Sequence, residues 1–109
     1  MSSLSTHVLD TGLGLPAHGV PVRLYRVTGD QDVVLATGTT DDDGRIAELE
    51  PALPAGTYRL WFDVAAYAAA SGQDIFFPEV AVTFTVADER HYHVPLLLSP
   101  FAFSTYRGS

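Results

Sequence analysis

Residues 57–72, TYRLWFDVAAYAAASG, contain the two patterns that decide the fold. Alternate residues from Tyr58 to Phe62 are large and apolar, and a period of two is typical of a half-buried β-strand. The alternation then stops. Asp63 is a residue type that caps helix starts, the alanines favour helix, and Gly72 is a residue type that ends one. This stretch therefore predicts a strand followed by one short helix.

The rest of the chain repeats the strand pattern, with turns rich in Gly, Pro and Asp between the strands. The turn at 41–44, DDDG, has a local cause, because Asp bonds nearby backbone and Gly tolerates positive φ. In addition to 57–64, the predicted strands are residues 5–11, 20–27, 33–40, 45–50, 79–88, 91–99 and 101–106. Seven or eight short strands with one helix predict an all-β fold, a two-sheet β-sandwich. A length of 109 residues predicts a single domain, 1–109.

Composition limits the possible classes of function. Six basic residues against thirteen acidic ones give a net charge of −7, which argues against a nucleic-acid partner. The absence of cysteine excludes disulfides, thiolate chemistry and cysteine-ligated metals. The first residues show no secretion signal, and no apolar run approaches the ~20 residues that span a membrane. We therefore expect a cytoplasmic protein without a membrane partner.

The histidines are the first candidates for chemistry. His7 lies inside the first predicted strand, and His91 and His93 are two residues apart in another, so both project from one face of it. That face continues through Pro95 and Leu97. One sheet face thus carries polar groups at one end and apolar groups further along, which is the layout of a pocket floor.

Each of these patterns also has a simpler interpretation. A single histidine in a strand is more often a structural or surface residue than a catalytic one. The pair His91 and His93 could ligate a metal, but the sequence places no third ligand, so we expect no metal. Arg45, after the acidic turn, is either a solvated surface residue or a fixed anion-binding group. The chain has no G-x-S-x-G nucleophile motif and no phosphate-binding glycine loop.

Three separated segments resemble one family. STHVLDTGLGLPAHGVPVRLYR (5–26), TTDDDGR (39–45) and HYHVPLLLSPFAFSTYRGS (91–109) are similar to the 5-hydroxyisourate hydrolases, transthyretin-related enzymes of urate breakdown. The terminal YRGS separates these hydrolases from transthyretin, a hormone carrier on the same fold. The resemblance, which runs from Leu4 to Ser109, implies a prealbumin-like sandwich. It also implies a homotetramer, a dimer of dimers with active sites in a channel at the dimer–dimer interface.

The resemblance also implies an activity and a set of site residues. The substrate is 5-hydroxyisourate, and hydrolysis of a cyclic amide gives 2-oxo-4-hydroxy-4-carboxy-5-ureidoimidazoline without metal or organic cofactor. The catalytic residues fall on His7, Arg45 and His93, with either histidine as the base that activates water. His91 shares a face with His93, nearer the mouth of the channel. Residues of the terminal motif that bind substrate are Tyr106, Arg107, Gly108 and Ser109.

The chain end is expected to be buried and fixed if the last strand borders that channel. Gly108 lets backbone approach closely. Arg107 offers a planar fork to an anionic oxygen. The terminal carboxylate of Ser109 would then be a fixed acceptor.

Two other classes of function remain open at this point. A non-catalytic transthyretin-like carrier would need an open apolar channel, not a cluster such as His7, His93 and YRGS. Tight hormone-like binding without turnover would favour it. A structural repeat of a surface protein would predict an export signal or neighbouring repeats, and we expect neither.

Overall fold

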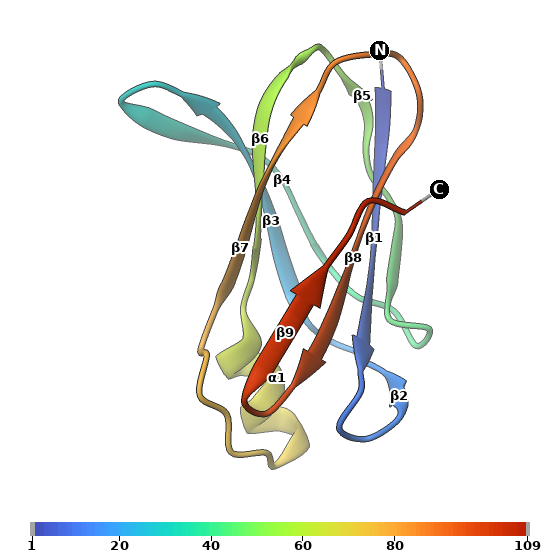
Figure 1. Ribbon diagram of the computed structural model, residues 1–109, viewed down its shortest axis with the longest axis vertical. Helices are drawn as coiled ribbons and strands as arrows, with labels where there is room; N and C mark the ends of the chain where they lie inside the picture. The colour runs from blue at the N-terminus through green and yellow to red at the C-terminus, as the bar shows by residue number, and fades with distance from the viewer. Residues whose placement is uncertain (1, 109) are drawn as a thin grey trace.

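Two β-sheets pack face to face in the computed structural model, which describes residues 2–108 (Figure 1). In the first sheet the strand order is β2-β1-β8-β9, and β5 also pairs with β1; in the second it is β4-β3-β6-β7. The first sheet contains β1 (Ser2–Asp10), β2 (Leu15–Pro16), β5 (Arg45–Leu53), β8 (Tyr92–Ser99) and β9 (Ala102–Thr105). The second contains β3 (Pro21–Thr28), β4 (Gln31–Thr39), β6 (Gly56–Phe62) and β7 (Val80–Val86).

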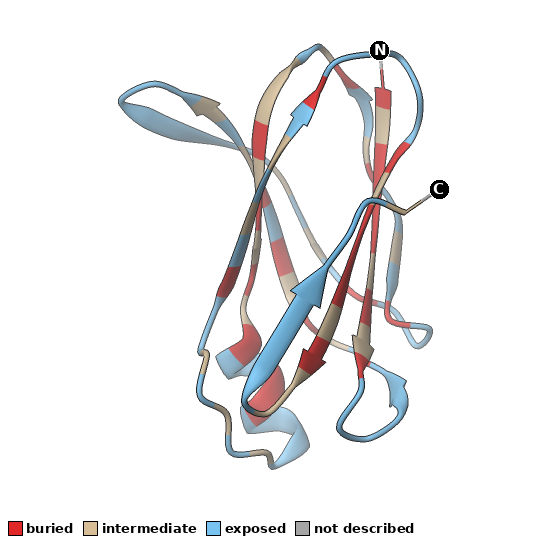
Figure 2. Ribbon diagram, in the orientation of Figure 1, coloured by how far each residue is buried: buried red, intermediate tan, exposed pale blue. Residues whose placement is uncertain are grey.

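The core lies between the sheets and follows the alternation in the sequence. Tyr58, Leu60 and Phe62 of β6 are each 0% exposed, while the residues between them are only half-buried. On β8, Tyr92, Val94 and Leu96 contribute to the same core. Figure 2 shows this as buried segments interrupting β1, β8 and β6, whereas β9 is exposed along its length. The predicted two-sheet sandwich is confirmed.

The one helix among residues 2–108, α1 (Val64–Ser71), begins and ends as predicted. The carboxylate of Asp63 accepts a hydrogen bond from the Ala66 amide at 3.0 Å, which satisfies one of the free N–H groups of the first turn. Gly72 ends the helix at φ 70°, and its amide donates to the carbonyl of Ala68. Within residues 2–108 no helix has the length and apolarity needed to cross a membrane.

Three differences from the predicted strands stand out, and the first is that β1 begins at Ser2 instead of residue 5. The structure has nine strands in its described part, because Leu15–Pro16, inside a predicted turn, pairs with the end of β1. Strand β5 continues to Leu53, where the prediction ended it at residue 50 because of Pro51. Pro51 is tolerated because β5 is an edge strand and its pairing with β1 shifts register between Glu50 and Leu53.

Candidate active site

Three neighbouring strands of the first sheet carry the candidate site on the face that points away from the core. His7 of β1 lies directly opposite Arg45 of β5. Ser5 of β1 lies opposite His93 of β8 in the parallel pairing on the other side. Because alternate residues of a strand share a face, these four side chains project from the same side of the sheet. The structure thus brings together the three residues for which a catalytic role was predicted.

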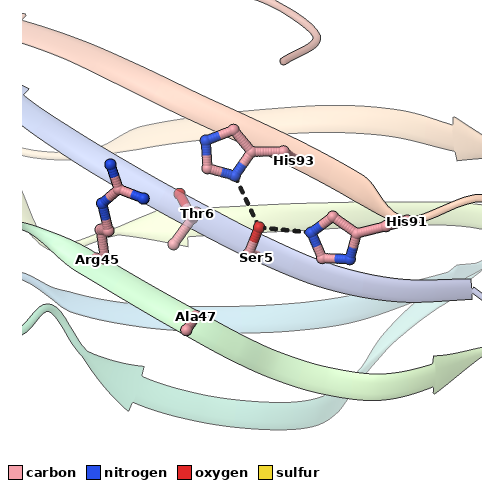
Figure 3. A pocket seen from close by; sticks show the side chains of 6 residues that line it. All are labelled: Ser5, Thr6, Arg45, Ala47, His91 and His93. Carbon is pink, nitrogen blue, oxygen red and sulfur yellow. Dashed lines mark hydrogen bonds between the residues drawn. The ribbon is translucent and has the colours of Figure 1, made fainter. Parts of the chain in front are cut away.

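A cavity of about 260 Å³ lies on this face. The residues that line it are Ser5, Thr6, Arg45, Ala47, His91 and His93 (Figure 3). His7 is next to the cavity, across the strand pair from Arg45, and is not among the lining residues. The outer face of the sheet is therefore a shallow polar pocket with a guanidinium on one side and two imidazoles on the other.

The DDDG turn fixes the backbone of Arg45. The carboxylate of Asp41 accepts hydrogen bonds from the amides of Asp43 and Arg45, both at 2.9 Å. Gly44 has φ 74°, and a Cβ there would lie 2.3 Å from the carbonyl oxygen of Val8. Only glycine fits this close approach, which also allows the Val8 amide to donate to the Gly44 carbonyl at 2.7 Å. The turn thus anchors the start of β5 to the middle of β1.

His7 is held by the same turn. Its Nε2 atom lies 2.9 Å from the backbone carbonyl oxygen of Asp43. Since a carbonyl oxygen only accepts hydrogen bonds, Nε2 of His7 donates. In the neutral ring the Nδ1 atom of His7 then keeps its lone pair and can accept a proton.

His93 and His91 are connected through one hydroxyl group. Ser5 Oγ lies 2.7 Å from Nδ1 of His93 and 2.8 Å from Nε2 of His91 (Figure 3). On the far side of His91, Nδ1 lies 2.5 Å from Oγ of Ser3. The sequence interpretation missed both serines. Their position was visible in the sequence, because Ser3 and Ser5 precede His7 by four and two residues and therefore share its face of the strand.

The environment of His93 favours its neutral form. Partial burial is the main reason why the pKa of His93 lies below its ordinary value of 6.5. Coulombic repulsion from His7, His91 and Arg45 against a charged His93 ring lowers its pKa further. At neutral pH the imidazole of His93 is therefore uncharged and able to act as a base.

Gly108 brings the described end of the chain into contact with His93. The amide of Gly108 donates to the carbonyl of His93 at 2.8 Å, and a Cβ on Gly108 would lie 2.4 Å from the His93 ring. Tyr106 is 57% exposed. The Arg107 guanidinium carbon lies 4.5 Å from the centre of the Tyr92 ring.

The tail up to Arg107 is thus exposed in the single chain, although Arg107 and Gly108 line a neighbouring cavity together with His91. Ser109, with the terminal carboxylate, lies outside the described residues. Substrate binding by the terminal motif stays a prediction. The part of the chain that the structure describes gathers no group of three or more His, Cys, Asp or Glu side chains suited to a metal.

Comparisons with known proteins place the chain in a family. The sequence profile of the HIUase/Transthyretin family matches residues 4–108. The chain belongs to this family. A curated family member, 5-hydroxyisourate hydrolase of Mus musculus, is 47% identical over 113 residues, which cover 99% of this chain and 96% of the relative.

Solved structures of the HIUase/Transthyretin family have the same fold. The structure of Klebsiella pneumoniae 5-hydroxyisourate hydrolase matches with a TM-score of 0.90 and 43% identity, over 100% of both chains. Sea bream transthyretin in complex with thyroxine matches with a TM-score of 0.91 and 37% identity, over 96% of this chain and 93% of that one. The predicted family and its prealbumin-like sandwich are confirmed.

Proposed function

We propose that this chain hydrolyses 5-hydroxyisourate, opening one ring of a flat, oxygen-rich bicyclic purine derivative. The observation that carries the proposal is the cavity that His93 shares with Arg45. A neutral imidazole and a guanidinium that line the same cavity supply a base and an anion-stabilising group, which are the two groups that amide hydrolysis requires. The curated relatives named 5-hydroxyisourate hydrolase support the same activity.

His93 and His7 are the candidates for activating water. Water is a poor nucleophile at neutral pH, so its attack on the acyl carbon needs a base that removes a proton. His93 lines the cavity and is neutral at neutral pH because burial lowers its pKa. His7, with Nδ1 free of the bond to Asp43, is positioned to hold or move a second proton.

Arg45 stabilises the charge that the attack creates. When the oxygen of water bonds to the acyl carbon, the carbonyl oxygen becomes an oxyanion, and a positioned guanidinium binds such an oxygen strongly. The C–N bond then breaks, and the leaving ring nitrogen takes a proton. Because the Asp41 and Gly44 contacts fix the start of β5, the backbone of Arg45 is held at the edge of the cavity before the substrate arrives.

The proposal extends to the tail, the assembly and the compartment. Tyr106, Arg107, Gly108 and Ser109 bind substrate once a homotetramer, a dimer of dimers, has closed the channel around the outer face of the first sheet. The backbone bond from Gly108 to His93 already ties this tail to the site. The reaction uses no metal and no organic cofactor, and it takes place in the cytoplasm.

The direct test follows ultraviolet absorbance after urate is oxidised in situ, with and without the protein. We expect the decay of 5-hydroxyisourate to accelerate strongly. His7→Ala, Arg45→Ala and His93→Ala should each remove most of this acceleration while circular dichroism shows an unchanged fold. Near-normal rates in two of the three variants would refute the site.

A carrier function is the second candidate, because sea bream transthyretin, a structure with 37% identity, is in complex with thyroxine. The cavity argues against it, since a guanidinium and two imidazoles line it. Calorimetry with thyroxine, performed alongside the hydrolysis assay, separates the two functions. Tight binding together with no acceleration would establish a carrier.

A further inference from the structure

The outer face of the first sheet carries an unbroken chain of four hydrogen-bonding side chains, Ser3, His91, Ser5 and His93. The successive contacts measure 2.5, 2.8 and 2.7 Å. Ser5 is only 7% exposed and His93 is half-buried, whereas His91 is exposed. This hydrogen-bond chain thus runs from the cavity to solvent, and each of its contacts joins a hydroxyl group to a ring nitrogen.

The chemistry of a hydroxyl group limits the proton arrangement of this chain. Ser5 has one O–H proton, so it donates to one imidazole and accepts from the other. Two neutral arrangements satisfy every bond, and they differ in which nitrogen of His93 carries the proton. In the first, Nδ1 of His93 is protonated and Nε2 is bare; in the second, the reverse holds.

Arg45 selects the first arrangement. Figure 3 shows the second ring nitrogen of His93 on the side of the ring that faces Arg45. A guanidinium has only donors, so a bare Nε2 is favoured on that side and an N–H group is not. Nδ1 of His93 therefore donates to Ser5, Ser5 donates to Nε2 of His91, and Nδ1 of His91 donates to Ser3.

We infer that Ser5 and His91 are positioning residues of the hydrolase, which hold His93 with a bare Nε2 and carry its surplus proton to solvent. This inference rests on the proposed function and adds a route for protons to it. The groups that face His93 in this arrangement are Ser5 and His7 on β1, Arg45 on β5 and His91 beside β8.

The same hydrogen bonds can carry a proton away from His93 when water attacks and return one when the substrate nitrogen leaves. Water gives a proton to Nε2 of His93 as its oxygen bonds to the acyl carbon. The Nδ1 proton then moves to Ser5, the Ser5 proton to Nε2 of His91, the Nδ1 proton of His91 to Ser3, and the Ser3 proton to bulk water. When the ring nitrogen of the substrate leaves, it takes the Nε2 proton of His93, and the same chain in reverse returns a proton to Nδ1.

The kinetic test uses one variant that keeps the contact to Ser5 but blocks proton transfer, and a second that removes the bridging hydroxyl group. In His91→Gln the amide can still contact Ser5, but it cannot pass on a proton. We expect kcat to fall about tenfold or more with little change in KM, and added imidazole buffer to restore part of kcat. Ser5→Ala should likewise lower kcat with little change in KM. Ser99→Ala is the matched control, since Ser99 lies on β8 and its hydroxyl donates to the Ala102 carbonyl at 3.1 Å, outside the hydrogen-bonded group of Ser3, His91, Ser5 and His93.

The second readout does not depend on activity. Nitrogen-15 spectra of the labelled imidazoles should show Nδ1 of His93 protonated at neutral pH, with this preference reduced in Ser5→Ala. A predominantly Nε2-protonated His93 would overturn the inference, and so would a buffer-independent kcat in folded His91→Gln. A wild-type protein without hydrolase activity would instead contradict the proposed function and leave the spectra as the test of the hydrogen-bond chain.

Discussion

The backbone amide of Gly108 donates to the backbone carbonyl of His93, and Gly108 lies so close to the imidazole that any side chain there would overlap it. A Cβ would meet the Cδ2 atom of His93 at 2.4 Å. The last described residue of the chain is thus packed against the candidate base. It restricts the ring orientation that the bond to Ser5 sets from the other side.

Gly108→Ala should therefore reduce activity without unfolding the protein. The added methyl group must push the His93 ring aside, and a displacement of about 1 Å can lower a rate about 100-fold. The measurement is kcat with freshly generated 5-hydroxyisourate, together with the melting temperature. Gly14→Ala is a control for activity only: its Cβ meets nothing within 4 Å, but its φ of 71° strains alanine, so its melting temperature should fall while kcat stays unchanged. Unchanged kcat in Gly108→Ala would show that the tail does not position His93.

The rate should fall on the acid side of pH 6.5. The pKa of His93 is held below that value, first by burial and then by His7, His91 and Arg45. As pH decreases through this lowered pKa, the ring becomes protonated and can no longer accept a proton from water. The pH profile of kcat/KM gives the midpoint. In Arg45→Gln, NMR titration of the ring should give a higher pKa, since one positive neighbour is gone. A wild-type midpoint above 6.5 would contradict the assignment of His93 as base.

Gly44→Ala should destabilise the fold and lower activity together. The substitution forces a non-glycine residue to φ 74° and places its Cβ 2.3 Å from the Val8 carbonyl. We expect a loss of about 3 kcal/mol in the free energy of unfolding, measured in urea. Gly19→Ala has a similar φ of 82° but meets nothing within 4 Å, so it isolates the backbone cost. Equal losses in both variants would show that the approach to Val8 is not strained.

Tyr67→Phe should lower stability at the opposite end of the sandwich and leave hydrolysis unchanged. Tyr67 donates to the buried carboxylate of Asp10 at 2.6 Å, and Gln73 donates to it at 2.9 Å. Removal of one donor from a buried carboxylate costs about 1–3 kcal/mol. Urea unfolding at neutral pH measures this, with Tyr25→Phe on β3 as the control. An unaltered free energy of unfolding would show that the Asp10 contact contributes nothing.

The same cluster predicts a pH dependence of stability. Burial alone would raise the pKa of Asp10, but the bonds from Tyr67, Gln73 and the Leu13 and Gly12 amides outweigh it, so the pKa lies below 3.8. The stabilisation is thus complete above pH 3.8 and is lost as pH falls through the lowered value. Burial and Asp10 raise the pKa of Tyr67 to about 12, so the fold also loses stability as pH rises past 10. Both losses should be smaller in Tyr67→Phe.

The particle mass should be about four times the chain mass of 11.7 kDa. The proposed channel needs a second dimer over the outer face of the first sheet, and the exposed cavity of the single chain is consistent with that. Light scattering at several concentrations, combined with the hydrolysis assay, gives the mass of the active species. A stable, fully active monomer would rule out a site at a subunit interface.

The sequence predicted the layers and the helix because each is determined locally. The alternation at Tyr58, Leu60 and Phe62 and the caps at Asp63 and Gly72 depend only on near neighbours. The strand through Leu15–Pro16 and the extension of β5 past Pro51 depend instead on pairing with β1. No local pattern encodes pairing with a distant strand, so these two features were missed.

The site was predicted less completely for the same physical reason. Motifs identified His7, Arg45 and His93 as site residues. That they lie close together depends on the register of the strand pairs, which a motif does not encode. Ser5 escaped notice because a serine in a strand has no distinctive chemistry until a histidine lies opposite it. The stacking of Arg107 on Tyr92 was also unforeseen, since it depends on how the tail leaves β9.

The parallel pairing of β1 with β8 has a consequence for biosynthesis. Ser5 and His93 are 88 positions apart, so the ribosome must extrude β8 before the N-terminal strand gains this neighbour. Such distant contacts form late and slowly in folding. A nascent chain can thus bury much of its second sheet, completed by β7, while it still has no working pocket. Catalytic competence therefore arises only after β8 has been synthesised and paired with β1.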